Sequence, residues 1–316
     1  MGTAAPLVLL MGPTAAGKST LALALAERID GEIISVDSAQ VYRGMDIGTA
    51  KPVPELRRRV PHHLIDIRDP ADSYSAGEFV RDALAAIAQI RARDRQPLLV
   101  GGTALYLRAL YRGLALLPPA CGSIRRELDA HAQTHGWSVL HAELESIDPA
   151  AAARIAAHDT QRIQRALEVY RLTGVPLSQW QGTTQGAREQ FRWLRYALVP
   201  EQGVDARAEL RARLEARFGR MLDAGLVEEV ARLYARGDLT TQHASIRAVG
   251  YRQLWQMFAA DMSLAEARGR AVIASAQLAK RQLTWLRREE TLTLLPMNSV
   301  GIIEALAADI LAAARA

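Results

Sequence analysis

The chain has 316 residues, of which 49% are hydrophobic and 23% charged, and its formal net charge is +5. Domains usually span roughly 100–200 residues, so the length predicts one large or two medium domains. The composition is that of an ordinary globular protein. A single cysteine, Cys121, excludes an internal disulfide and fits a reducing compartment. Arginine supplies most of the positive charge, and a basic surface is compatible with a polyanionic partner.

The first apolar segment, Leu7–Met11, lies close to the N-terminus. It is too short to span a bilayer, and no basic residue precedes it, so we expect neither a transmembrane helix nor a signal peptide. Because it leads directly into a glycine-containing loop, we expect a buried strand. We therefore expect a cytoplasmic protein that has no membrane partner, and we expect a monomer.

Three apolar segments have the character of buried parallel strands: Pro6–Met11, Glu32–Val36 and Pro97–Val100. Each is followed by a polar or glycine turn and then by a helical stretch, as a βαβ unit requires. The best helical stretches are Ser19–Arg28 and Ala76–Ala92. This alternation predicts an α/β fold with a central, mostly parallel sheet.

The pattern changes after Gly113. The segment Leu114–Ala120 contains two consecutive prolines, which are typical of a linker, and Ser123–Gly174 has a helical pattern. Strand-like character returns at Trp193–Val199. We therefore predict a catalytic core formed by residues 1–113 and 193–316, with a mostly helical insertion at 114–192.

The last third of the chain predicts two long helical regions, about Asp205–Arg236 and Leu264–Arg288. Apolar periodicity in the first region predicts an inward face. We expect that face to contain Leu210, Leu214, Phe218, Met221 and Val227–Val230.

A phosphate-binding motif follows the first predicted strand. The pattern G-x-x-x-x-G-K-[ST] is matched by Gly12, Pro13, Thr14, Ala15, Ala16, Gly17, Lys18 and Ser19. In such a P-loop, backbone N–H groups converge on phosphate oxygens, and the N-terminus of the next helix adds positive charge. Lys18 would neutralise a terminal phosphate, and Ser19 would ligate Mg²⁺. The motif predicts a P-loop core with a nucleotide- or pyrophosphate-type ligand.

The remaining apparatus of a nucleoside triphosphatase is missing from the sequence. The strand Pro97–Val100 ends in two glycines and Thr103 with no acid, and the chain has no Asn-Lys-x-Asp guanine-binding motif. Asp37 is the acid at a strand end, where α/β proteins bind ligands. It could ligate Mg²⁺, act as a general base or cap a helix. The hydroxyl of Thr103 could likewise contact a substrate or cap a helix.

His62 and His63, followed by Asp66 and Asp69, superficially suggest a metal site. No cysteine or further histidine accompanies them at ligand spacing. We therefore favour a structural role, in a turn that enters a strand.

Two basic segments near the C-terminus, Arg247–Arg252 and Lys280–Arg288, combine cations with Tyr251 and Trp285. On a helix, one face would contain Arg281, Thr284, Trp285 and Arg288. Cations interleaved with aromatic rings suit phosphate contacts and base stacking. The alternative is a solvated helix face with the tryptophan packed inward.

Together these residues carry a family resemblance. The P-loop and Ser35–Pro52 strongly resemble the bacterial tRNA dimethylallyltransferase family. The resemblance extends over nearly the whole chain, and it includes Pro61–Asp66, Val100–Thr103, Ser245–Gln253 and Lys280–Arg287.

The resemblance implies that a dimethylallyl group is transferred from dimethylallyl diphosphate to a tRNA. The acceptor would be the exocyclic amine of the adenosine 3′-adjacent to the anticodon, and the tRNA anticodon stem-loop would be the partner. The P-loop would bind the diphosphate of the donor with Mg²⁺ as cofactor. Asp37 is implied as the general base, with Lys18 and Thr103 as further catalytic residues.

Contacts to tRNA are implied by the same resemblance. The residues are Asp37, Ser38, Ala39, Gln40, Thr103, Arg125, Gln161, Arg162, Ile163, Gln164, Arg165, Arg247, Ala248, Val249, Gly250, Tyr251, Arg252, Lys280, Arg281, Gln282, Leu283, Thr284, Trp285, Leu286 and Arg287.

Two other classes of protein remain open from the residues alone. A small-molecule or nucleoside kinase that uses ATP would explain the P-loop but not the basic, aromatic C-terminal helix. A non-catalytic RNA-binding protein with a P-loop would explain the charge, and Asp37 would then be dispensable.

Overall fold

A computed structural model describes residues 5–115, 117–180, 186–201, 206–260, 262–297 and 301–315. The chain divides into two compact units, Met1–Arg108 with Arg188–Ala316, and Ala109–Ala187. Both limits of the second unit lie a few residues before those that the sequence pattern suggests for the insertion. No helix among the described residues is both long enough and apolar enough to span a bilayer.

The first unit is built on a parallel sheet. Its described strands are β1 (Leu7–Met11), β2 (Gly31–Val36), β3 (His62–His63), β4 (Gln96–Gly101), β5 (Trp193–Val199) and β6 (Thr293–Pro296). They pair in the order β3-β2-β4-β1-β5-β6, and every pair is parallel. The predicted α/β class is confirmed, and the strand predicted at Trp193 joins this sheet.

The central strands are mostly apolar because helices cover both faces of the sheet. On one face, Val8, Leu10 and Leu98 pack with the helices α1 (Lys18–Arg28) and α14 (Ile302–Arg315). The side chains that alternate with them are also buried, and α3 (Ala76–Arg91) packs against β2 and β4.

The one charged residue of β2, Glu32, explains the neighbouring histidines. Its carboxylate is 2% exposed and lies 2.6 Å from His63 Nε2 and 2.7 Å from the Arg93 guanidinium. His62 Nδ1 lies 2.7 Å from the carbonyl oxygen of Val60. The side chain of His63 therefore joins strand β3 to β2, and that of His62 contacts the backbone just before β3, in keeping with the structural role that we favour.

The remaining helices of the first unit differ from the sequence prediction in several places. They are α2 (Pro54–Arg59), α10 (Ala206–Asp223), α11 (Leu226–Tyr234), α12 (Tyr251–Ala259) and α13 (Leu264–Leu286), while α4 (Ala104–Arg112) spans the boundary between the units. The helical region predicted at about Asp205–Arg236 consists of two helices, because the chain turns at Gly225, whose φ is +96°. Its predicted first residue, Asp205, lies outside the described residues.

Two predicted helix faces also require correction. Glu228 is exposed, whereas its neighbours Glu229 and Val230 are buried. Helix α13 ends at Leu286, so Arg288 lies beyond the helix and does not share a face with Arg281.

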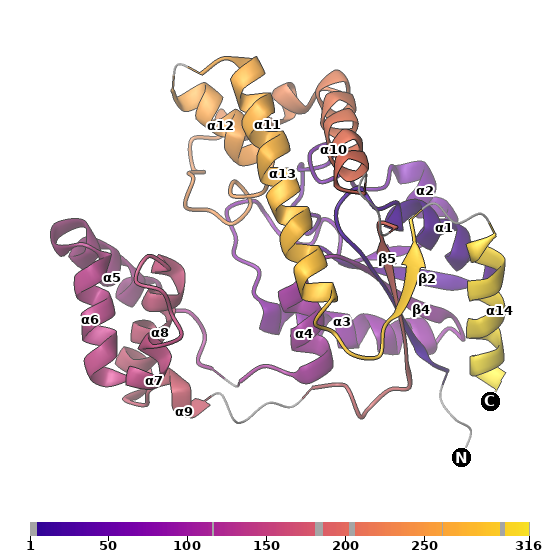
Figure 1. The fold of residues 1–316 in the computed structure, drawn as a ribbon, viewed down its shortest axis with the longest axis horizontal. Coiled ribbons are helices and arrows are strands. Elements are labelled where there is room, and N and C mark those ends of the chain that lie inside the picture. The colour runs from indigo at the N-terminus through magenta and orange to yellow at the C-terminus, as the bar shows by residue number, and fades with distance from the viewer. Residues whose placement is uncertain are drawn as a thin grey trace. The chain divides into compact units, whose positions relative to one another are not determined.

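The second unit is helical where it is described. Its helices are α5 (Gly122–His135), α6 (Trp137–Ile147), α7 (Pro149–Ala152), α8 (Thr160–Thr173) and α9 (Leu177–Trp180) (Figure 1). Leu128, Leu140, Leu144 and Leu167 form part of its core. Besides the predicted break at Asp148, the chain breaks at Gly136, whose φ is +85°.

Candidate active site

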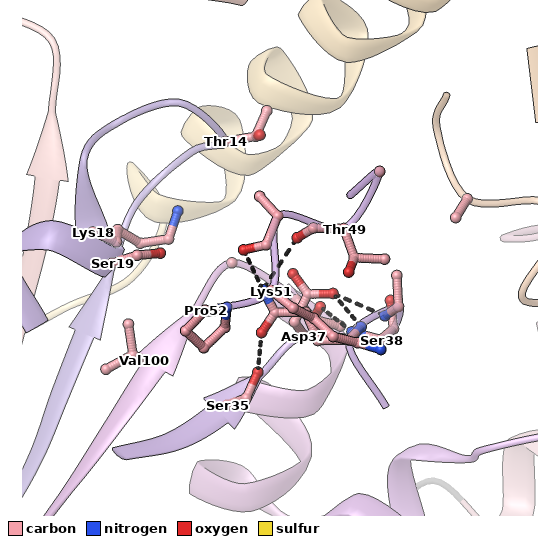
Figure 2. A pocket seen from close by; sticks show the side chains of 18 of the residues that line it. Thr14, Lys18, Ser19, Ser35, Asp37, Ser38, Thr49, Lys51, Pro52 and Val100 are labelled. Carbon is pink, nitrogen blue, oxygen red and sulfur yellow. Dashed lines mark hydrogen bonds between the residues drawn. The ribbon is translucent and has the colours of Figure 1, made fainter. Parts of the chain in front are cut away.

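Three loops meet at one edge of the sheet because parallel strands end on the same side. They are the P-loop after β1, the Asp37 turn after β2 and the segment Gly102–Thr103 after β4. These loops line a cavity of about 900 Å³ in the first unit. Figure 2 shows Lys18 and Ser19 on one side of this cavity and Asp37 and Ser38 on the other.

The backbone of the P-loop depends on its two glycines. Gly12 has a φ of +155°, and a Cβ there would lie 2.8 Å from the carbonyl oxygen of Leu198. Gly17 has a φ of +88°, in the left-handed region that favours glycine, and helix α1 begins at the next residue. The motif therefore brings Lys18 and Ser19 to the first turn of a helix at the cavity.

Lys18 is held against its own loop. Its Nζ donates hydrogen bonds to the carbonyl oxygens of Gly12 at 2.9 Å and Pro13 at 2.7 Å. Burial, followed by the nearby guanidinium of Arg217, lowers the pKa of Lys18 to about 8, although Asp37 acts in the opposite direction. An anionic ligand would relieve this repulsion, so the loop is suited to negative charge.

Asp37 forms a tight turn. Its Oδ1 accepts hydrogen bonds from the backbone amides of Ala39 at 2.8 Å and Gln40 at 3.3 Å. No helix begins directly after this turn, so Asp37 does not cap a helix; its carboxylate caps the backbone amides of the turn itself. Within the described residues, the hydrogen bonds of this carboxylate involve Oδ1 alone, which leaves Oδ2 for a substrate.

Thr103 and Gln40 fix the surroundings of that turn. Thr103 Oγ1 accepts a hydrogen bond from the amide of Ser38 at 3.2 Å, which ties the β4 loop to the β2 loop. Gln40 Oε1 accepts from Ser35 Oγ at 2.8 Å, and its Nε2 donates to the carbonyl oxygen of Thr49 at 3.1 Å. The side chain of Gln40 therefore serves the shape of the pocket.

Arg217, in helix α10, also lines the cavity, and the sequence analysis did not identify it. It is partly buried, and burial lowers the pKa of its guanidinium while Asp37 raises it. Its spacing in the sequence could have identified it, because Arg217 falls on the same inward helix face as Leu210, Leu214 and Met221. Arg217 and Lys18 thus both contribute positive charge beside the carboxylate of Asp37.

Gln282, in helix α13, links two of the three loops. Its Oε1 accepts from the amide of Thr14 at 2.8 Å, and its Nε2 donates to the carbonyl oxygen of Gly102 at 3.0 Å. A side chain at Gly102 would overlap this amide group. Gln282 thus joins the P-loop to the loop of Thr103, a role that the sequence did not predict.

The two basic C-terminal segments contribute both to the cavity and to the surface. Residues that line the cavity are Arg247, Ala248, Val249, Arg281 and Gln282. Arg252, Lys280, Thr284 and Arg287 are exposed, whereas Leu283 and Trp285 are half-buried. Gly250, Tyr251 and Leu286 are buried and pack inside the protein, so we leave their side chains out of any contact surface.

In the second unit, Arg125 and Arg165 share one carboxylate. Glu168 is fully buried, and it accepts from Arg125 at 2.8 and 3.1 Å and from Arg165 at 2.5 Å. Ile163 is also fully buried, so its side chain packs in the core of this unit instead of facing a ligand.

The rest of this helical segment is more accessible. Gln161 and Arg162 are exposed, and Gln164 is half-buried and donates to Asp129 at 2.7 Å. Of the predicted contact residues in this unit, Gln161 and Arg162 are the exposed ones, while Arg125, Gln164 and Arg165 are half-buried.

Hard oxygen donors are present for a divalent cation. Ser19 and Asp37 line the same cavity, and Mg²⁺ typically takes one or two protein oxygens, phosphate oxygens and water. Groups of three or more His, Cys, Asp or Glu side chains that could hold a metal are not found among the described residues. The donor set therefore fits a cation that arrives with a diphosphate.

Comparisons with known proteins agree with this architecture. Residues 40–289 match the family model described as IPP transferase. The chain is 53% identical to the tRNA dimethylallyltransferase of Thioalkalivibrio sulfidiphilus, over 93% of this chain and 91% of that one. It is 55% identical to the enzyme of the same name from Halorhodospira halophila, over 90% of each chain.

Two crystal structures are similar along almost the whole chain. The full-length tRNA isopentenylpyrophosphate transferase from Bacillus halodurans is 38% identical with a TM-score of 0.70, covering 98% of this chain and 96% of that one. A eukaryotic dimethylallyltransferase acting on tRNA is 26% identical with a TM-score of 0.76, covering 96% of this chain and 76% of that one. The resemblance inferred from the P-loop and Ser35–Pro52 is thereby confirmed, and the chain belongs to the tRNA dimethylallyltransferase family.

Proposed function

We propose that this protein transfers the dimethylallyl group of dimethylallyl diphosphate to the exocyclic amine of the adenosine 3′-adjacent to the tRNA anticodon. The observation that carries the proposal is one cavity that contains a P-loop lysine, a carboxylate at a strand end and two basic C-terminal segments. Membership of the family supports the same reaction.

The P-loop side of the cavity suits the diphosphate of the donor. Lys18, Arg217 and the backbone amides of the P-loop oppose the negative charge that grows on the diphosphate when its carbon–oxygen bond breaks. The cavity is also lined by the apolar side chains of Leu23, Ile33, Val53, Leu56 and Val100, which suit a short hydrocarbon.

The Asp37 side suits the acceptor. The amine nitrogen forms a bond to the allylic carbon as diphosphate leaves, and the nitrogen must then lose a proton. Asp37 Oδ2 would accept that proton as the general base, while Thr103 holds the turn through the amide of Ser38. An unpaired anticodon loop lets the adenine leave its stack at low cost.

We further propose Mg²⁺ as the cofactor, held by the Ser19 hydroxyl, diphosphate oxygens and water. When bound, the cation would supply further neutralisation of the leaving group. The exposed cations Arg247, Arg252, Lys280, Arg281 and Arg287 would contact tRNA phosphates. In the second unit, Gln161, Arg162 and Gln164 would contact the anticodon stem-loop.

The test is mass spectrometry of tRNA after incubation with the protein, dimethylallyl diphosphate and Mg²⁺. We expect one prenyl group on the adenosine 3′ of the anticodon, and no product on a matched tRNA with another base at that position. Phosphorylated product formed from ATP would support a kinase instead. Tight tRNA binding without any product would support a non-catalytic RNA-binding protein.

A further inference from the structure

Glu229 is a buried carboxylate to which neither the sequence analysis nor the proposed reaction assigns a task. It lies in α11 and is 2% exposed. Its oxygens accept hydrogen bonds from the consecutive amides of Asp46 at 2.9 Å, Ile47 at 2.9 Å and Gly48 at 3.2 Å. Tyr251 Oη donates a fourth hydrogen bond at 2.5 Å. Four donors on one buried carboxylate form a specific anchor for a loop.

The anchored loop forms a wall of the active-site cavity. Gly48, Thr49, Ala50, Lys51 and Pro52 all line it. The loop lies directly on the tyrosine of the anchor, because a Cβ at Gly48 would lie 2.5 Å from the Tyr251 ring. Burial, followed by the charge of Glu229, raises the pKa of Tyr251, so its hydroxyl stays protonated and continues to donate.

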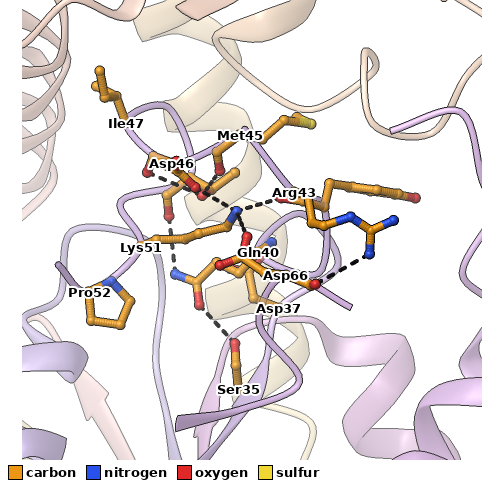
Figure 3. Close-up of polar contacts among 12 residues, drawn as sticks. Ser35, Asp37, Gln40, Arg43, Met45, Asp46, Ile47, Lys51, Pro52 and Asp66 are labelled. Carbon is orange, nitrogen blue, oxygen red and sulfur yellow. Dashed lines mark hydrogen bonds and ion pairs between the residues drawn. The ribbon is translucent and has the colours of Figure 1, made fainter. Parts of the chain in front are cut away.

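A second set of contacts holds the far end of the same loop. Lys51 is 8% exposed, and its Nζ donates to the carbonyl oxygen of Tyr42 at 2.5 Å, to Asp46 at 2.8 Å and to Asp66 at 2.5 Å. Figure 3 shows the ammonium group of Lys51 between Asp46 and Asp66, with Gln40 beside it. The loop is therefore fixed by a carboxylate at one end and by an ammonium group at the other.

This loop connects the anchor to the turn that carries Asp37. The carbonyl oxygens of Thr49 and Ala50 accept from Gln40 Nε2 at 3.1 and 3.4 Å. The backbone amide of Gln40 in turn donates to Asp37 Oδ1 at 3.3 Å. A displacement of the loop would therefore move the candidate base by way of Gln40.

We propose that Glu229 and Tyr251 are positioning residues for prenyl transfer, which hold the loop Asp46–Ala50 and, through Gln40, the Asp37 turn in working geometry. The inference rests on the proposed function. In this proposal the buried partner of Tyr251 is Glu229, whereas the family resemblance implied that Tyr251 contacts RNA.

The main test is Glu229→Gln, an isosteric change that places an amide N–H among groups that are all donors. We expect kcat to fall about 10²-fold, because small misplacements of a catalytic group cost on this order. The P-loop is untouched, so KM for dimethylallyl diphosphate should stay within about threefold. The matched control is Glu228→Gln, its exposed neighbour on the same helix turn, which should leave both constants unchanged.

Two milder variants keep the test decisive if Glu229→Gln does not fold. Tyr251→Phe keeps the ring and removes one donor, and we expect kcat to fall about tenfold while KM for dimethylallyl diphosphate stays within about threefold. Gly48→Ala, which pushes the loop off the ring, should give the same pattern. Normal kcat in all folded variants, or equal changes in kcat and donor KM, would overturn the inference. Absence of product from the wild-type protein would instead contradict the proposed function.

Discussion

At the scale of single residues, the proposed reaction gives the carboxylate of Asp37 a chemical task in addition to its structural one. Oδ1 accepts the two amides that close the turn, and Oδ2 remains for a proton. Substitution by alanine removes both tasks, so it cannot separate them. Asparagine keeps an oxygen acceptor for the amides of Ala39 and Gln40 but removes the base.

We therefore expect Asp37→Asn to lower the rate of transfer about 10²–10⁴-fold, as is typical when a general base is lost, while tRNA still binds. Single-turnover transfer and tRNA affinity are the measurements. Near-normal transfer by the asparagine variant, together with a slow Asp37→Ala variant, would assign Asp37 to the turn alone.

Lys18 gives the reaction a dependence on pH. With a pKa of about 8, Lys18 is mainly charged at neutral pH and loses its proton as the pH rises through 8. A bound diphosphate stabilises the charged form and so raises this pKa. Donor affinity should consequently fall by about tenfold per pH unit above about pH 8, since binding then requires uptake of a proton.

The control for this effect is Lys18→Arg, which stays charged at every pH in that range. Its donor affinity, measured by titration with dimethylallyl diphosphate, should be flat between about pH 7 and pH 9. Equal slopes for the two proteins would attribute the pH dependence to another group.

The sequence identified site residues where the signal is local and missed them where it is distant. The P-loop and Asp37 are found because each stands beside a recognisable strand. Glu229 could not be found, since its partner Asp46 is 183 residues away in the chain. Gln282 and Arg217 belong to helices whose inward faces can be predicted from the apolar pattern. The pattern does not predict which loop each of those faces contacts.

At the scale of elements, helix α13 contacts the P-loop through Gln282 and presents cations to solvent at its C-terminal end. If those cations bind tRNA, Arg281→Ala and Arg287→Ala should each lower the slope of log affinity against log salt concentration by about 0.7–0.9. Arg270→Ala is the control, because Arg270 is exposed near the start of the same helix and pairs with Glu266. Unchanged slopes in both test variants would leave the helix with a packing role only.

In the second unit, the pair Arg125–Glu168 makes a different prediction. Burial alone would raise the pKa of Glu168, but hydrogen bonds from Arg125 and Arg165 outweigh it and lower the pKa. The carboxylate is then ionised at neutral pH, and its stabilising effect is lost only as the pH falls into the acid range.

Arg125→Ala should consequently destabilise the protein by about 2 kcal/mol in urea unfolding, the usual scale for a hydrogen bond to a charged group. Arg126→Ala, at the exposed neighbouring position, should have no such effect. If Arg125→Ala instead weakens tRNA binding at unchanged stability, Arg125 acts as an RNA contact.

The elements that the pattern predicted are long or strongly apolar. Among those that it did not predict, β6 is short, but helix α14 has 14 residues. β3 has two residues and β6 has four, which is too few for a periodicity to appear. α10 and α11 form one continuous apolar pattern, and only the backbone conformation of Gly225 separates them. Local spacing thus determines that a helix forms, while its ends depend on single residues.

At the scale of the whole molecule, strand order is the property that sequence patterns least determine. β1 lies between β4 and β5 in the sheet. In the sequence, β5 follows the second unit. The parallel arrangement nonetheless brings every strand end to one edge, which is why the three loops share a cavity. The fold class alone therefore predicts where the site lies but not which distant helices complete it.

The last prediction concerns the whole reaction: transfer should proceed with donor and Mg²⁺, and ATP should not be consumed. A P-loop recognises phosphate oxygens and not a base, so it serves any diphosphate. Hydrolysis or phosphoryl transfer would need an acid such as that of Walker B. The end of β4 does not supply one, since a side chain at Gly101 would overlap the carbonyl oxygen of Val36, and the proposed reaction assigns Asp37, at the end of β2, to the acceptor amine. Product formation without ATP, measured on tRNA alongside ADP release, is the test, with Lys18→Ala as the control that should slow transfer. A requirement for ATP, or ADP that accumulates with product, would identify a kinase.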